Sequence, residues 1–173
     1  DRYGFNNPDN EWDNEEIEFF LVGDSFTMGE CVNRPYDFGS VLRKLSKKSV
    51  LNLGYSSNGP MLQFAALKEY LDENVNNILW FYYEDNDLQD LNDTMNSKIL
   101  NSYLDNKEFS QSLRSKQKEI DIIVDNTVKE HLKYFQSREE KKKKNQILRF
   151  IRLDKTKDKL KVLLNNNNKK EKF

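Results

Sequence analysis

The sequence has only one cysteine and one histidine among its 173 residues. A single cysteine, Cys31, excludes a disulfide bond within the chain, and no group of cysteine and histidine residues has the spacing of a zinc site. We therefore expect no disulfide scaffold, no metal site and no bound cofactor.

Long apolar runs are also absent, since none approaches the roughly 18 to 20 residues of a membrane span. No basic-then-apolar signal segment stands at the start of the chain. The chain begins with Asp1 and not with a methionine, so we expect it to be a fragment or a processed product. Contact with a membrane is left open.

Glycine and proline are missing from most of the chain, because all six glycines and all three prolines lie within the first 60 residues. Turns are therefore expected there, and the rest is expected to be mostly helical. A length of 173 residues is typical of one domain with one core.

Neither sign of charge dominates, because 28 basic side chains nearly balance 29 acidic ones, and this argues against a generally basic nucleic-acid binder. The halves differ, however. Residues 1–90 hold 7 basic and 17 acidic side chains, and residues 91–173 hold 21 and 12. The basic run Lys141 to Lys144 is typical of a solvated helix face or a linker. An alternative is that the basic half binds an acidic polysaccharide or nucleic acid, with an affinity that falls steeply with salt.

What is present is an alternation of apolar segments. Residues 17–22, 49–53 and 77–83 are short β-favouring runs, and the first two end at Gly23 and Gly54. An amphipathic helix is predicted around Phe38 to Leu45, and a second helix begins at Pro60. Strands alternating with helices predict an α/β fold with a parallel sheet.

The flanking regions differ from this pattern. Residues 1–16 are polar and turn-rich and predict an extended lead-in, held to the core by Tyr3, Phe5 and Trp12. Beyond residue 95 two helical stripes are expected, one from Ile120 to Phe135 and another from Ile147, separated by a charged run. We expect three parts: residues 1–95 as the α/β part, 96–164 as a helical insertion or lid, and 165–173 as a disordered Asn/Lys-rich tail.

Ligands bind beyond the carboxyl ends of parallel strands, so the residues that follow each strand are the candidates for chemistry. Ser25 follows the first strand, Gly54 the second, and Asn86 the third. A serine hydroxyl beside N–H donors is what acyl transfer from an ester needs. Ser25 is then the nucleophile, and the oxyanion donors are the backbone N–H groups of Ser25 and Gly54 and the side chain of Asn86.

At these residues the sequence resembles the SGNH, or GDSL-type, hydrolase family. Gly23-Asp24-Ser25 with Gly29 is similar to its first block, Asn52-Leu53-Gly54 to its second and Asn86-Asp87 to its third, and the resemblance extends over about residues 3–91. It implies a flavodoxin-like three-layer α/β/α fold and metal-free hydrolysis or transfer of acyl groups on carbohydrate or lipid esters. It implies Ser25 as nucleophile and Gly54 and Asn86 in the oxyanion hole. Such families often act on cell-envelope polymers.

Two departures from the family pattern bear on catalysis. Asp85 stands where the family usually has glycine, and it adds a possible negative charge beside the oxyanion site. The late Asp-x-x-His motif that supplies the general base is absent, and the one histidine, His131, lies on a predicted helix stripe. Truncation would explain this, because three strands are few for such a sheet; a chain of these residues alone should have an exposed sheet edge and associate.

Two classes of function therefore remain. The first is a serine-dependent ester hydrolase or acyltransferase, whose substrate is a small-molecule or polysaccharide acyl ester. The second is a non-catalytic α/β binding module, in which Ser25 caps a helix, Gly54 ends a strand and Asn86 caps another helix. Under either, Asp24 and Asp87 are expected to hold loop backbone through hydrogen bonds.

Overall fold

The computed structural model describes residues 1–151 and 156–162. It consists of two compact units, Asp1–Gln117 and Lys118–Phe173. The predicted boundary at residue 95 falls inside the first unit, because helix α5 (Lys98–Asp105) packs against helix α3 (Pro60–Tyr70). The expected tail, 165–173, lies outside the described residues.

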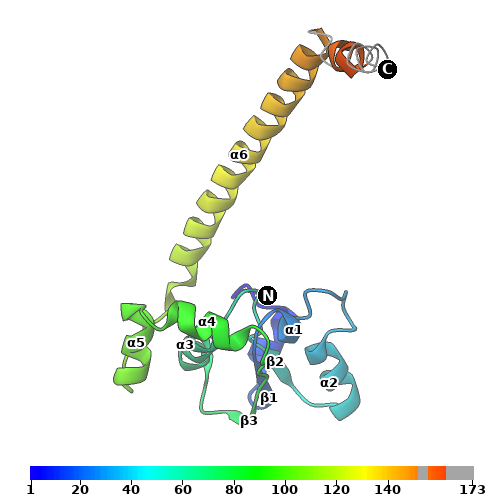
Figure 1. Cartoon of the computed structure of the whole chain (residues 1–173). Helices are drawn as coiled ribbons and strands as arrows, with labels where there is room; N and C mark the ends of the chain where they lie inside the picture. Colours follow the sequence, from blue (N-terminus) through cyan, green and yellow to red (C-terminus); the bar gives the residue numbers. More distant parts are fainter. Residues whose placement is uncertain (152–155, 163–173) are drawn as a thin grey trace, which may run out of the picture. The chain divides into compact units, whose positions relative to one another are not determined.

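Unit 1 is built on a parallel sheet, which confirms the predicted α/β class (Figure 1). Its strands are β1 (Ile17–Val22), β2 (Val50–Asn52) and β3 (Val75–Trp80), in the order β2-β1-β3. The first strand has its predicted bounds. The third begins two residues earlier than predicted and ends at Trp80, so residues 81–83 follow the strand instead of belonging to it.

Helices pack on the two faces of the sheet near β1 and β2, whereas most of β3 is exposed. Phe20 and Val22 point to one face, where they join Leu67 and Tyr70 of α3 in the main core. On the opposite face, helix α2 (Phe38–Ser46) lies against β2, and the Arg43 Nε donates to the backbone carbonyl of Val50 at 3.0 Å. Strand β1 lies between two neighbours and two helix layers, and its last three residues are fully buried.

The lead-in is not extended, contrary to the prediction. Residues 1–8 form turns, and Asp9–Asp13 form a short 3-10 helix. The aromatic anchors are confirmed, because the rings of Phe5 and Trp12 are buried with their centroids 5.0 and 6.0 Å from the ring of Tyr70. Packing against α3 therefore folds the segment back on the core.

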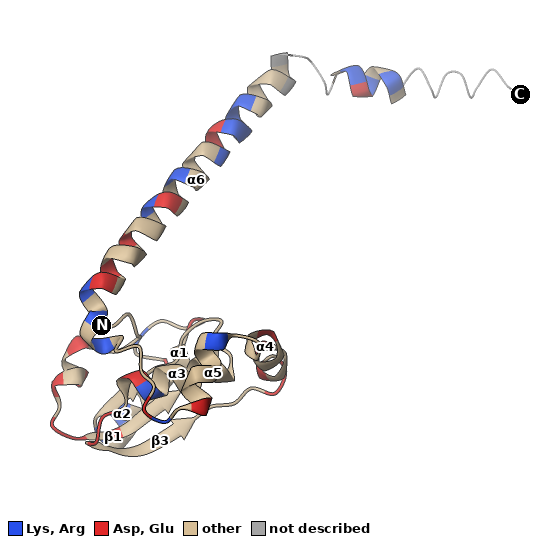
Figure 2. Ribbon diagram, turned by 90° about the vertical axis from the view of Figure 1, so that its left-hand side faces the viewer, with Lys and Arg blue, Asp and Glu red and all other residues tan. Residues whose placement is uncertain are grey.

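Unit 2 contains all but the first residue of helix α6 (Gln117–Ile151). The charged run from Arg138 to Lys144, which separates the two expected helical stripes in the sequence, continues the helix and is not a linker (Figure 2). Lys141 to Lys144 are exposed, and Val124, Val128 and Leu132 are about half exposed. Propagating a helix adds one hydrogen bond per residue, so a solvated charged turn does not stop it.

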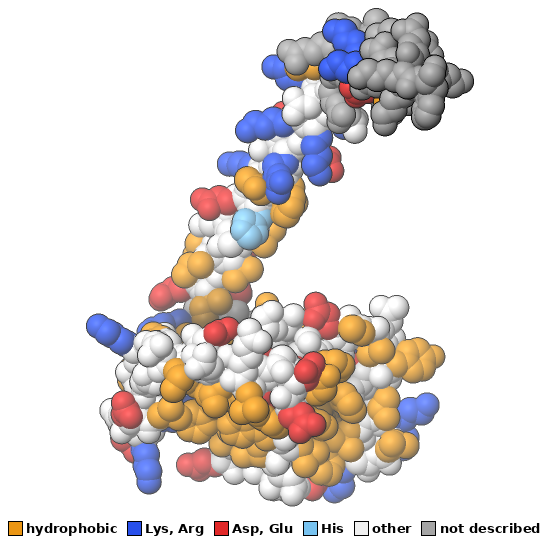
Figure 3. Space-filling model, in the orientation of Figure 1, with side chains coloured by type: hydrophobic (Ala, Val, Ile, Leu, Met, Phe, Trp, Pro, Cys, Tyr) orange, Lys and Arg blue, Asp and Glu red, His pale blue; other side chains and the backbone are white. Residues whose placement is uncertain are grey.

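Hydrophobic side chains gather on one face of unit 1 (Figure 3). Helix α2 is confirmed, but its apolar residues Phe38, Val41 and Leu45 are exposed. In β3, Ile78 and Trp80 are exposed by more than two fifths. No strand among the described residues lies beyond β3.

Candidate functional site

Ser25 is the first residue of helix α1 (Ser25–Met28) and is separated from the end of β1 only by Gly23 and Asp24. The preceding Asp24 caps this helix, because its Oδ1 accepts the backbone N–H of Phe26 at 2.9 Å. The helix-capping role considered for Ser25 therefore belongs to Asp24. Ser25 is partly exposed, and its hydroxyl makes no hydrogen bond to any residue in the described part of the chain.

The loop after β2 is pressed against this helix at Gly54. A Cβ atom on Gly54 would lie 2.3 Å from the backbone nitrogen of Met28 and 2.6 Å from the carbonyl carbon of Thr27. Those atoms are backbone, so they cannot rotate away. The block containing Ser25 and the block containing Gly54 thus meet, as the sequence predicted, and only a residue without a side chain fits there.

Asn52 joins the two blocks, and the sequence analysis assigned it no role. Its buried side chain donates through Nδ2 to the Thr27 carbonyl at 2.6 Å and accepts the Gly54 N–H through Oδ1 at 2.8 Å. The single N–H of Gly54 is therefore occupied. It reaches an oxyanion only if Asn52 gives up this bond.

The rest of this loop carries donors that sequence reasoning missed. The backbone N–H groups of Ser56 and Ser57 bond to nothing in the described part of the chain, and Ser57 has a left-handed φ of 63°. The Ser56 hydroxyl donates to the Glu30 carboxylate at 2.9 Å. The signal was present in the sequence, because Tyr55-Ser56-Ser57-Asn58 stands between two glycines after a strand.

Asn86 precedes helix α4 (Asp87–Thr94) at the end of the third loop. Its side chain does not cap the helix; Nδ2 donates to the Asp90 carboxylate at 2.9 Å, and Oδ1 is buried without a partner among the described residues. An amide nitrogen carries two hydrogens, so one remains for another acceptor. Asp85 is exposed.

Asp87 holds the third loop, as predicted, because its Oδ2 accepts the backbone N–H of Tyr83 at 2.7 Å. Burial raises the pKa of the Asp87 carboxyl, and the carboxylates of Asp24 and Asp90 raise it further against the opposing hydrogen bond from Tyr83. The loops after β1 and β3 therefore lie close enough for the charge of Asp24 to affect the pKa of Asp87. They also touch, because the rings of Phe26 and Tyr83 lie 5.0 Å apart.

The general base is not supplied by a histidine of unit 1, because the one histidine is His131 in α6 of unit 2. Its side chain is exposed. Within the described residues, Ser25 has neither a hydrogen-bonded base nor an orienting carboxylate. A serine without a base is a weak nucleophile.

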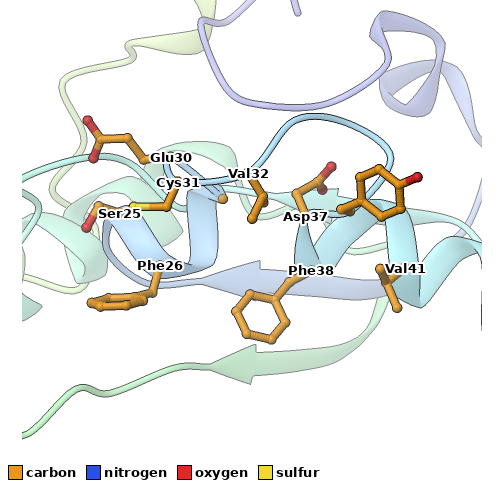
Figure 4. A pocket seen from close by; sticks show the side chains of 10 residues that line it. Ser25, Phe26, Glu30, Cys31, Val32, Asp37, Phe38 and Val41 are labelled. Atoms are coloured by element: carbon orange, nitrogen blue, oxygen red, sulfur yellow. The ribbon is translucent and has the colours of Figure 1, made fainter.

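A cavity of about 340 Å³ opens beside Ser25 (Figure 4). Ser25 and Phe26 border it from α1, and Phe38 and Val41 border it from α2. The loop between the helices closes the remaining side with Gly29, Glu30, Cys31, Val32, Tyr36 and Asp37. Most of these side chains are apolar, and none carries a positive charge.

No group of histidine, cysteine, aspartate and glutamate side chains in residues 1–151 and 156–162 has the arrangement of a metal site. In the same residues, no helix has the length and apolar character needed to cross a bilayer. Comparison with known protein families, curated proteins and solved structures gave no match.

Proposed function

We propose that this chain carries the nucleophile part of a serine-dependent ester hydrolase or acyltransferase, with Ser25 as the nucleophile. The observation that carries the proposal is the position of the Ser25 hydroxyl. It is partly exposed and without a partner among the described residues, at the start of a helix that the Gly54 loop touches. An unbonded hydroxyl alone does not distinguish Ser25, because that of Ser40 also bonds to nothing in the part of the chain that the structure describes. The position after β1, where the Gly54 loop touches the helix, does distinguish it.

The finer fold assignment is part of the same proposal. A parallel sheet in the order β2-β1-β3 is the beginning of the flavodoxin-like order 2-1-3-4-5. Ligands of such sheets bind at the point where the order reverses, and here that point lies between β1 and β3. Ser25 and Asn86 follow these two strands.

The proposed step is attack of the Ser25 oxygen on the carbonyl carbon of an acyl ester of a carbohydrate or lipid. The carbon–oxygen bond to the alcohol breaks, and the alcohol leaves with a proton. The proton of the Ser25 hydroxyl passes to a general base. This base is not a histidine of unit 1, because unit 1 contains no histidine. The Ser25 N–H and the second Asn86 hydrogen stabilise the oxyanion, and Gly54 adds its N–H when Asn52 releases it.

Rescue by imidazole tests this proposal. We expect slow hydrolysis of 4-nitrophenyl acetate by the chain, accelerated by added imidazole, and loss of that acceleration beyond the solution background in Ser25→Ala. Ser40→Ala is the matched control, because Ser40 lies in α2 outside the cavity lining and its hydroxyl bonds no described residue. Equal rates for Ser25→Ala and the unaltered chain would refute the proposal.

The second candidate is a non-catalytic binding module. It is favoured by the occupied Gly54 N–H and by the buried Asp87 carboxylate near Asp24, since negative charge opposes a developing oxyanion. This candidate predicts no imidazole-dependent turnover in the unaltered chain.

A further inference from the structure

The cavity beside Ser25 has walls that select one kind of substrate. Phe26, Val32, Phe38 and Val41 border it together with Tyr36, so apolar surface from α1, the connecting loop and α2 faces one space (Figure 4). Burying apolar surface is favourable roughly in proportion to the area removed from water. A ligand with an apolar segment therefore gains affinity here.

The charges at the cavity exclude anionic segments. The two ionisable carboxyls at its border belong to Glu30 and Asp37, and no lysine or arginine borders it. Asp37 is buried, with one carboxylate oxygen accepting the Ser40 N–H and the other without a partner among the described residues. A carboxylate or phosphate of the ligand would be repelled by the Glu30 carboxylate and would find no basic side chain at the border of the cavity.

The size of the cavity separates short acyl groups from longer ones. Its volume of about 340 Å³ lies at the lower end of the range of small-molecule sites, roughly 300 to 1,000 Å³. An acetyl group would leave most of this space and most of the apolar wall unused. A single unbranched chain of several carbons uses both.

We propose that this cavity is the acyl site, and that the substrate is an ester of an uncharged medium-chain acyl group. The inference rests on the proposed function, because it takes Ser25 as the nucleophile at the mouth of the cavity. The carbonyl carbon then lies at Ser25, and the alkyl chain runs between the loop and α2. Val32 and Val41 contact the chain from these two elements.

The test compares two fluorophosphonates that differ only in their alkyl chain, ethyl and octyl, on the full chain. Ser25 forms a bond to phosphorus, fluoride leaves and the hydroxyl proton passes to the buffer, so intact mass reports each rate. Each buried methylene is worth about a fourfold gain in binding. We therefore expect octyl to label at least about tenfold faster than ethyl.

Filling the cavity should remove this preference. Val41→Trp, or Val32→Trp on the opposite wall, should bring the octyl-to-ethyl ratio close to one. Leu45→Trp is the matched control, because Leu45 lies one turn further along α2, is exposed and does not border the cavity. It should keep the ratio.

The outcomes separate this inference from the proposed function. If both reagents label Ser25 at equal rates, the acyl site is refuted, but Ser25 is still a nucleophile. The same holds if Leu45→Trp loses the octyl preference as fully as Val41→Trp does. Absence of labelling by both reagents refutes the nucleophile and with it the acyl site. Binding of octan-1-ol, measured by calorimetry and lost in Val41→Trp, would then show an apolar ligand site without ester chemistry.

Discussion

Gly54 lies directly against the backbone of helix α1. A Cβ atom there would overlap the backbone of Thr27 and Met28, so Gly54→Ala forces the loop and helix α1 apart. We expect a loss of about 3 kcal/mol in the free energy of unfolding, at the upper end for overpacking. Urea unfolding measures it.

Gly4→Ala is the control for this prediction. Gly4 has a φ of 86°, yet nothing lies within 4 Å of the position of its Cβ. It should lose only the roughly 1 to 2 kcal/mol of a left-handed alanine. If Gly54→Ala is no more destabilising than Gly4→Ala, the close approach of the two loops is not present in solution.

Glu69 ties the segment before α6 to helix α3. Its carboxylate accepts the Tyr103 hydroxyl and the backbone N–H groups of Gln111 and Leu113. Burial acts to raise the pKa of Glu69, but these hydrogen bonds, with one from Ser110, outweigh it and hold the pKa below its ordinary value of 4.5. Ionised Glu69 therefore stabilises the folded chain.

Because the folded pKa is lowered, this stabilisation is complete above the unfolded pKa near 4.5 and is lost as the pH falls through the folded value. Glu69→Gln should cost about 2 kcal/mol at pH 7, and the difference from the unaltered chain should shrink in acid. Urea midpoints over a pH series measure both. Glu73→Gln, at an exposed position, is the control; a pH-independent cost for Glu69→Gln would contradict this account.

At the scale of elements, the sequence predicts the buried parts best. Strand β1 has its predicted bounds because every residue of its run except Glu18 pairs with β3. Strand β3 was predicted at the most apolar residues, 77–83, but its pairing with β1 begins at Val75. The edge strand β3 contains two polar residues, Asn76 and Asn77. Their side chains donate hydrogen bonds to Glu16 and Glu18 of the neighbouring segment. Apolar patterning cannot detect such polar pairing.

The outer edge of β3 gives a prediction for the element itself. From Val75 to Tyr83 the chain has no charge and no proline, which are the usual protections of an edge strand. We expect the 173-residue chain to associate with rising concentration, measured by sedimentation velocity. Ile78→Lys should reduce this association, whereas Leu71→Lys, an exposed change outside the sheet, should not. A monomer at high concentration in the unaltered chain would contradict the expectation.

At the scale of the molecule, the candidate site is confined to unit 1. Its residues could be named from the sequence because each follows a strand of a parallel sheet. Their hydrogen bonds could not be predicted from the sequence, because they depend on side-chain geometry. Gly54 donates to Asn52, and Asn86 donates to Asp90. The role of Asn52 as a bridge to Thr27 was missed for the same reason.

The central claim is that Ser25 is a nucleophile, and covalent labelling tests it most directly. The full chain is treated with a fluorophosphonate, and the modified residue is located by peptide mass spectrometry, with Ser25→Ala and Ser40→Ala in parallel. We predict one adduct on Ser25, present in Ser40→Ala and absent in Ser25→Ala. No adduct, or an adduct that persists in Ser25→Ala, would contradict the account and leave a binding module.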